Sequence, residues 1–164
     1  MADKSSFTPD EWNMLLGAPM LAGMAVTLAE PNGLWGMLKE SMAGARSMLE
    51  AKQDAGASPL IKALVADMET SEGRGHAKDA FKAQLSAKSA AELKPQVMAA
   101  LSKIGSLLDA KAPAEAAGFK AWLKHTAEKV AEASSEGGFL GFGGIQVTDA
   151  EKASIGEVAA ALKA

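Results

Sequence analysis

The chain has 164 residues, a formal net charge of −3 and no cysteine. This length allows one domain with a buried core, whereas the lack of cysteine excludes disulfides, thiolate metal ligands and cysteine nucleophiles. Only Arg46 and Arg74 are arginines, so we expect no nucleic-acid partner, because such interfaces need clustered positive charge and arginine for bidentate contacts.

Residues 1–7 read as a short N-terminal tail before a strong helix-start signal. The tail has no basic region followed by an apolar core and a cleavage site, so we expect no secretory signal and a cytoplasmic protein. Thr8 is placed to cap a helix, Pro9 fits its first position, and Glu11 closes a capping box. Phe7 and Trp12 are spaced for a hydrophobic staple.

Residues 12–29 carry no charge and are apolar on every face, which is typical of a buried helix. The run approaches the length of about 20 residues that crosses a bilayer. It is diluted by Asn13, Gly17, Pro19 and Gly23, and the next apolar piece ends in Lys39 and Glu40. We therefore expect a central helix shielded by the rest of the chain, with a kink or break at residues 17–19 because proline removes a hydrogen-bond donor.

Periodic apolar residues predict further helices after a turn at residues 30–33. Amphipathic patterns cover residues 34–54 and 59–70, and the glycines of residues 71–76 are expected to break the second of these helices. A shorter helix follows at residues 77–85. A capping box at residues 89–92 then opens another helix, in which Pro95 either produces a kink or starts the main segment.

Two seams in the second half of the chain are typical of packed helices. The first consists of Val97, Leu101, Ile104 and Leu108. The second follows Pro113 and consists of Ala116, Phe119, Leu123, Thr126, Val130 and Ala133, with Glu115, Lys120, Lys124, Glu128 and Glu132 expected to lie away from it. Thr148 and Glu151 form a capping box for a last helix. Without any pattern for a sheet, the sequence predicts a single all-α domain over residues 1–164, a bundle of about five to seven helices around the N-terminal helix.

The histidines are the residues best suited to acid-base chemistry. His76 precedes Asp79 and His125 precedes Glu128, so each imidazole shares a helix face with a carboxylate. Both histidines lie among charged neighbours, and this order reverses the Glu-x-x-His pairs of di-iron bundles, so we expect surface histidines. Residues 67–78 have Glu72 at the sixth position, where a calcium loop requires glycine, and Lys78 at the twelfth position, where it requires glutamate. We expect no catalytic residue, no cofactor and no metal ligand.

The loop expected at residues 137–147 is unusual because it joins glycines to large apolar side chains, those of Phe139, Leu140 and Phe142. Glycines permit a tight path, so these side chains are expected to plug one end of the bundle. The alternative is a lid or a tip that enters a membrane surface, since exposed apolar loop residues usually contact a partner.

Methionine is concentrated in the first two predicted helices, as Met14, Met20, Met24, Met37, Met42 and Met48. Thioethers fill gaps in cores and also line adaptable apolar grooves. Our leading hypothesis is a non-enzymatic binding or interaction protein with an apolar groove near Trp12, Met20, Met24, Trp35 and Met37. The occupant would be an apolar small molecule or a protein partner. Assembly of the chain into a homo-oligomer is a further possibility that the sequence leaves undecided. The alternatives are membrane-surface association through the N-terminal hairpin or the 139–142 loop, and an enzyme using His76 or His125.

Overall fold

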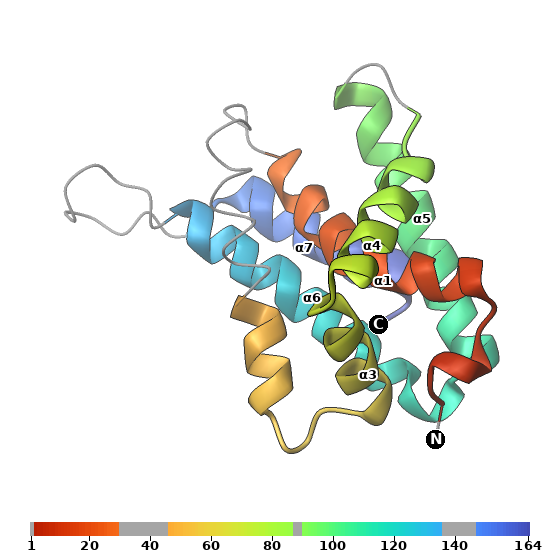
Figure 1. The fold of residues 1–164 in the computed structure, drawn as a ribbon. Helices are drawn as coiled ribbons and strands as arrows, with labels where there is room; N and C mark the ends of the chain where they lie inside the picture. Colours follow the sequence, from red (N-terminus) through yellow and green to blue (C-terminus); the bar gives the residue numbers. More distant parts are fainter. Residues whose placement is uncertain (1, 30–45, 87–89, 136–146) are drawn as a thin grey trace.

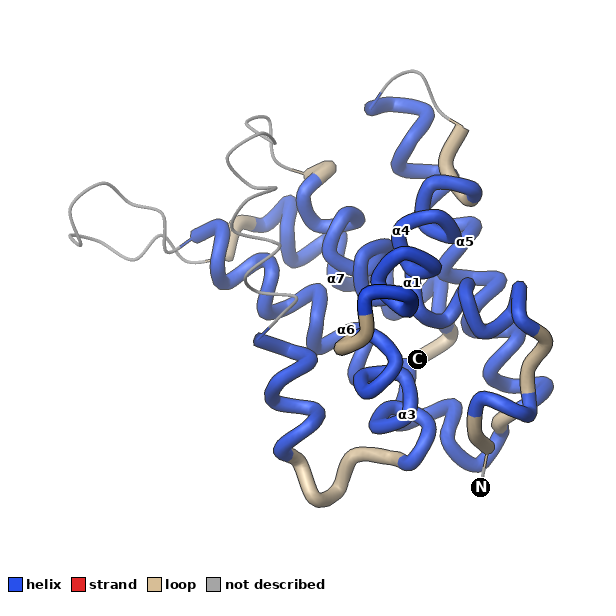
Figure 2. The backbone as a smooth tube through the Cα atoms, in the orientation of Figure 1, coloured by secondary structure: helices blue, strands red, loops and turns tan. Residues whose placement is uncertain are grey.

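The computed structural model describes residues 2–29, 46–86, 90–135 and 147–164, and within them the chain is a bundle of helices (Figure 1). A short 3-10 helix, η1 (Lys4–Ser6), precedes α1 (Pro9–Thr27). Residues 46–53 are helical and lead to α3 (Pro59–Met68) and α4 (Ser71–Ala83). The second half of the chain forms α5 (Ala90–Lys111), α6 (Pro113–Ser135) and α7 (Asp149–Leu162). Figure 2 shows no strand in the described ranges, so the predicted all-α class is confirmed.

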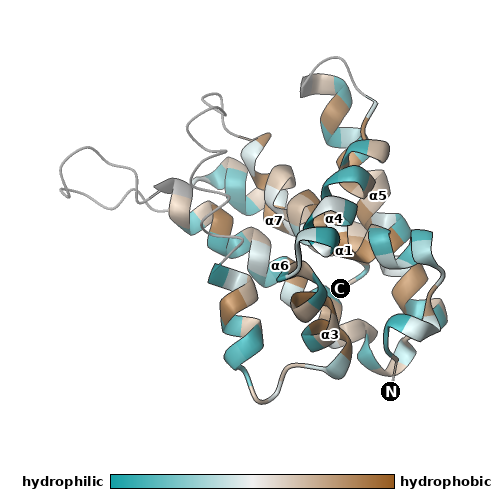
Figure 3. Ribbon diagram, in the orientation of Figure 1, coloured by the Kyte–Doolittle hydropathy of each residue, from teal (hydrophilic) through white to brown (hydrophobic). Residues whose placement is uncertain are grey.

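Helix α1 is the centre of the bundle, as its uncharged sequence predicted. It packs against α4, α5, α6 and α7, and the side chains of Leu15, Leu16 and Leu21 are fully buried. Met20 is the exception, with 37% of its surface exposed. Figure 3 shows brown, hydrophobic segments of α1 at the middle of the bundle, whereas α4 is mostly teal. The apolar N-terminal segment is therefore covered by the other helices of the same chain.

The start of α1 has the predicted cap. The Thr8 hydroxyl accepts a hydrogen bond from the Glu11 N–H, and the Glu11 carboxylate accepts one from the Thr8 N–H. The Phe7 ring lies 6.0 Å from the Trp12 ring, centroid to centroid, which confirms the staple. Of the two expectations for residues 17–19, the break is wrong, because α1 continues through Pro19, and the kink stays a prediction. An internal proline costs a helix about 3 kcal/mol, and burial of this helix by its neighbours outweighs that cost.

The predicted seams of α5 and α6 are also confirmed. Val97, Leu101, Ile104 and Leu108 of α5 are fully buried. On α6, Phe119, Leu123 and Thr126 are fully buried, and Val130 is nearly so. Helix α7 begins with the expected capping box of Thr148 and Glu151. The two seams and the capping box could be predicted because each depends on residues three or four positions apart, which lie close together on a helix.

The predicted interruption between the third and fourth helices is present, but it lies at Glu69 and Thr70, and its predicted position at residues 71–76 is wrong, since these residues form the first turns of α4. Thr70 caps the helix by accepting the Gly73 N–H at 2.9 Å. Gly73 lies so close to the end of α3 that a Cβ atom there would be 2.0 Å from the Asp67 carbonyl oxygen. The Arg74 guanidinium donates to the carbonyls of Met68 and Glu69, which terminate α3. The glycine thus permits close approach of two helices inside a helical turn.

Two charged residues of α6 are buried, contrary to the prediction that they lie away from the core. Glu115 is 8% exposed, and its carboxylate accepts the backbone N–H groups of Ala2 and Leu60. Lys120 is 4% exposed, and its ammonium reaches the surface carboxylate of Asp109 at 2.6 Å. Both side chains bury their aliphatic part and keep a partner for the charged group, which makes such burial tolerable.

Candidate functional site

A cleft of about 500 Å³ lies between the helical segment 46–53, the turn that follows it, and α6. We call it the Trp122 cleft. Its walls combine small apolar side chains with carboxylates, hydroxyls, an imidazole and an indole. The described residues that line it are Ser47, Glu50, Ala51, Asp54, Gly56, Ala57, Ser58, Ile61, Gly118, Ala121, Trp122 and His125.

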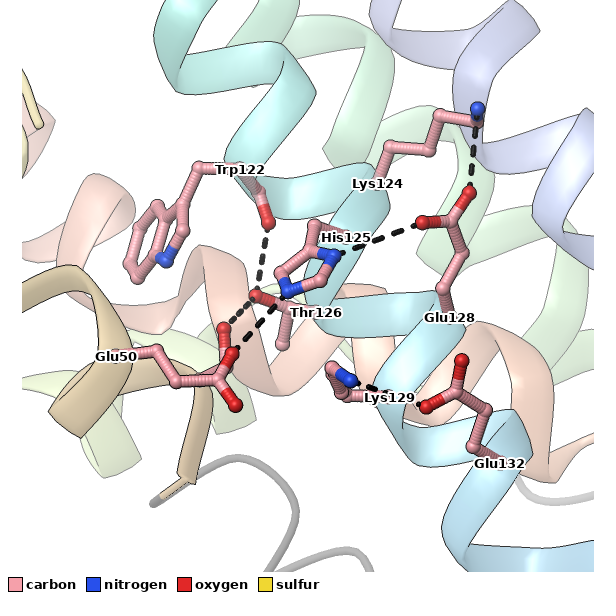
Figure 4. Close-up of polar contacts among 9 residues, drawn as sticks. Glu50, Trp122, Lys124, His125, Thr126, Glu128, Lys129 and Glu132 are labelled. Carbon is pink, nitrogen blue, oxygen red and sulfur yellow. Dashed lines mark hydrogen bonds and ion pairs between the residues drawn. The ribbon is translucent and has the colours of Figure 1, made fainter. Parts of the chain in front are cut away.

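A buried pair of hydroxyls fixes segment 46–53 against α6. The Oγ atoms of Ser47 and Thr126 lie 2.8 Å apart, and Thr126 donates to the Trp122 carbonyl at 2.9 Å. A hydroxyl has one proton to donate, so the Ser47 hydroxyl is the donor in the pair. Both hydroxyls are therefore satisfied, and the spacing of the two cleft walls is set beside Trp122 (Figure 4).

His125 occupies the open side of the cleft, between two carboxylates. Its Nε2 lies 3.2 Å from Glu50 Oε2 on segment 46–53, and its Nδ1 lies 3.7 Å from Glu128 Oε2 on α6. Glu128 also pairs with Lys124. Because 46% of the His125 side chain is exposed, these contacts are screened by water and contribute little to stability. They hold the imidazole between the carboxylates of Glu50 and Glu128 (Figure 4).

Trp122 forms the inner wall of the cleft and carries an unsatisfied donor. The side chain is 8% exposed, and its ring packs edge-on against Phe119 with a centroid distance of 5.3 Å. Its buried Nε1–H has no hydrogen-bond acceptor among the described residues. The indole of Trp12 shows the usual arrangement, since it donates to Asp67 at 2.7 Å. A buried donor without an acceptor costs about 1–3 kcal/mol, so an acceptor brought into the cleft would recover part of that cost.

Three of the residues predicted to form an apolar groove are described, and all three lie on α1. Trp12 is buried under Phe7, Met20 is exposed on α1, and Met24 packs against the core. None of these three lines the Trp122 cleft. Trp35 and Met37 lie outside the described residues, as do Phe139, Leu140 and Phe142 of the predicted loop. The apolar groove and the two roles of the loop stay predictions.

Asp67, which the sequence placed in an incomplete calcium pattern, has a structural partner set. Its carboxylate accepts from the Lys4 ammonium at 2.8 Å and from the Trp12 indole at 2.7 Å. The Lys4 hydrogen bond, followed by that of Trp12, lowers the pKa of Asp67 below its usual 3.8. The three residues join the N-terminal tail, α1 and α3, and the Lys4 ammonium lies 5.9 Å from the Trp12 ring centroid.

A second, apolar depression of about 510 Å³ lies where the end of α1 meets the first turns of α5, and it is lined by Leu28, Ala91, Lys94, Pro95 and Met98. His76 is exposed on α4. No group of three or more His, Asp or Glu side chains within the described ranges is arranged to hold a metal ion. No described helix combines the length and the apolarity that spanning a bilayer requires.

Sequence reasoning missed the Trp122 cleft. Trp122 and His125 lie three positions apart on one helix, which was readable from spacing. Glu50 and Ser47 come from a segment more than seventy positions earlier, and no local pattern connects it to α6. The comparisons add no further constraint: no family model, no curated protein and no solved structure matches this chain.

Proposed function

We propose that this chain is a non-enzymatic binding protein whose Trp122 cleft takes a small organic molecule. The observation that carries the proposal is the buried Nε1–H of Trp122, for which the described residues supply no acceptor, on the wall of a cleft of about 500 Å³. Ligand sites are typically concave and mostly apolar, with a few polar groups that orient the ligand. The alanine and isoleucine side chains, the indole and the His125–Glu50 pair supply such a set.

The contacts of the cleft hydroxyls favour binding over catalysis. Nucleophilic catalysis needs a hydroxyl within hydrogen-bond reach of a base. Ser47 is bonded to Thr126 instead, and the Ser58 hydroxyl caps α3 by accepting the Ile61 N–H. The imidazole of His125 contacts carboxylates. Neither lining serine is therefore positioned as a nucleophile activated by His125.

The test uses two glycines, one in the cleft and one outside it, that both have room for a larger side chain. A Cβ atom at Gly118, in the cleft, or at Gly156, on α7, meets nothing within 4 Å. Gly118→Leu fills the cleft without a backbone clash, and Gly156→Leu is the matched control. A thermal-shift and ligand-observed NMR screen of small organic molecules is expected to give hits with the wild type and Gly156→Leu that Gly118→Leu loses. Equal binding by all three proteins, or no hit at all, would refute the proposal.

A further inference from the structure

The charges around the Trp122 cleft select among small molecules. Glu50 and Asp54 contribute carboxylates to its lining, and no lysine or arginine is found among the described lining residues. Three lysines around the cleft are already engaged: Lys62 donates to the Ala55 carbonyl, Lys124 pairs with Glu128, and Lys129 pairs with Glu132. The cleft therefore presents an acidic rim, with His125 as its one titratable base in the described lining.

An acidic rim alone does not define a site, but the indole donor lies in the same cleft. The Nε1–H of Trp122 calls for an oxygen or nitrogen acceptor, and each carboxylate has lone pairs for more donors than it now meets. Figure 4 shows the indole and the imidazole extending from α6 on the side that faces Glu50. A ligand between the two walls would thus have a buried donor to reach on one side and anionic acceptors on the other.

We infer, resting on the proposed function, that the ligand is a small organic ammonium compound that also carries a carbonyl or hydroxyl oxygen. The oxygen accepts the Trp122 Nε1–H, and the ammonium lies against Glu50 and Asp54. A carboxylate ligand would face two like charges. A simple alkylamine would leave the indole unsatisfied, and a neutral amide would leave the carboxylates with water.

Four probes of similar size separate these contributions: 3-aminopropanamide, propylamine, propanamide and propanoate. Each is titrated into ¹⁵N-labelled protein, and the indole N–H resonance of Trp122 is assigned by its absence in Trp122→Phe. We expect 3-aminopropanamide to bind about 10-fold more tightly than propylamine, the ratio for one recovered hydrogen bond. It is expected to move the Trp122 indole proton downfield. Propanamide is expected to bind about 3- to 5-fold more weakly than 3-aminopropanamide because a partly exposed ion pair adds little.

Two variants assign the preferences to residues. Trp122→Phe is expected to abolish the difference between 3-aminopropanamide and propylamine. The double variant Glu50→Gln, Asp54→Asn is expected to weaken both amines and leave propanamide unchanged. Circular dichroism melts establish that each variant folds, and the double variant changes only exposed side chains.

The outcomes distinguish a wrong ligand class from a wrong site. Preference for propanoate, equal binding of propanamide and 3-aminopropanamide, or no response to any of the four probes overturns the inferred ligand class. If molecules of another class still bind the wild type and Gly156→Leu but not Gly118→Leu, the proposed function survives that result. If nothing binds in a manner blocked by Gly118→Leu, both fail.

Discussion

Glu115 offers the sharpest test of how this fold is held together. Its buried carboxylate accepts the Ala2 N–H at 2.8 Å and the Leu60 N–H at 2.9 Å, so it joins the N-terminal tail and the start of α3 to α6. A hydrogen bond to a charged group contributes about 1.5–3 kcal/mol. Glu115→Ala removes both bonds and leaves the buried Leu60 N–H unpaired, whereas the Ala2 N–H is only partly buried and can turn to water.

We therefore expect Glu115→Ala to lower the free energy of unfolding by about 2–4 kcal/mol, with Glu115→Gln intermediate because its carbonyl keeps one acceptor. For a chain of this size, 1 kcal/mol corresponds to about 2–4 °C in the melting temperature. Urea unfolding followed by circular dichroism measures the change. Glu157→Ala is the control, since Glu157 makes an exposed ion pair with Lys94 and is expected to change stability by less than about 0.5 kcal/mol. Equal effects of the two alanine variants would refute the structural role of Glu115.

Further predictions concern close helix contacts and one titration. A Cβ atom at Gly105 would lie 2.6 Å from the Leu162 carbonyl oxygen, so Gly105→Ala should destabilise the protein by about 1–3 kcal/mol; Gly156→Ala, in open space, should stabilise it by about 0.5–1 kcal/mol. Urea unfolding checks both, and a neutral Gly105→Ala would show that α5 and α7 are not in contact there. Because Lys4 and Trp12 lower the pKa of Asp67 below 3.8, the stability that Asp67 adds is present above that pH and is lost as the pH falls through its folded value. The stability difference between wild type and Asp67→Asn should therefore be constant above about pH 5 and shrink below about pH 3.8; a difference independent of pH down to about pH 2 would contradict the assignment.

Local sequence signals predicted the helices well where the cause of the helix was local. The capping boxes that begin at Thr8 and Thr148 and the seam from Val97 to Leu108 depend on residues a turn apart, and all are present. Gly73 was misread because its role depends on the Asp67 carbonyl of the preceding helix. Glycine weakens an isolated helix, so propensity alone favoured a break. The close packing of α3 and α4 reversed that preference.

The buried charges and the cleft were missed for a related reason. Glu115 has the spacing of a solvent-facing residue, and only the arrival of Ala2 and Leu60 makes its position buried and satisfied. His125 was correctly expected at the surface, but its pairing with Glu50 requires segment 46–53 to lie along α6. Contacts between residues so far apart in sequence depend on the whole packing of the bundle, which no single periodicity specifies.

The indole N–H resonance of Trp122 tests the central claim most directly. Titration with 3-aminopropanamide should move it downfield in a saturable manner in the wild type and in Gly156→Leu, and should leave it unchanged in Gly118→Leu. An indole resonance that stays fixed in the wild type at saturating probe, or that moves equally in Gly118→Leu, would contradict binding of this ligand class at the Trp122 cleft.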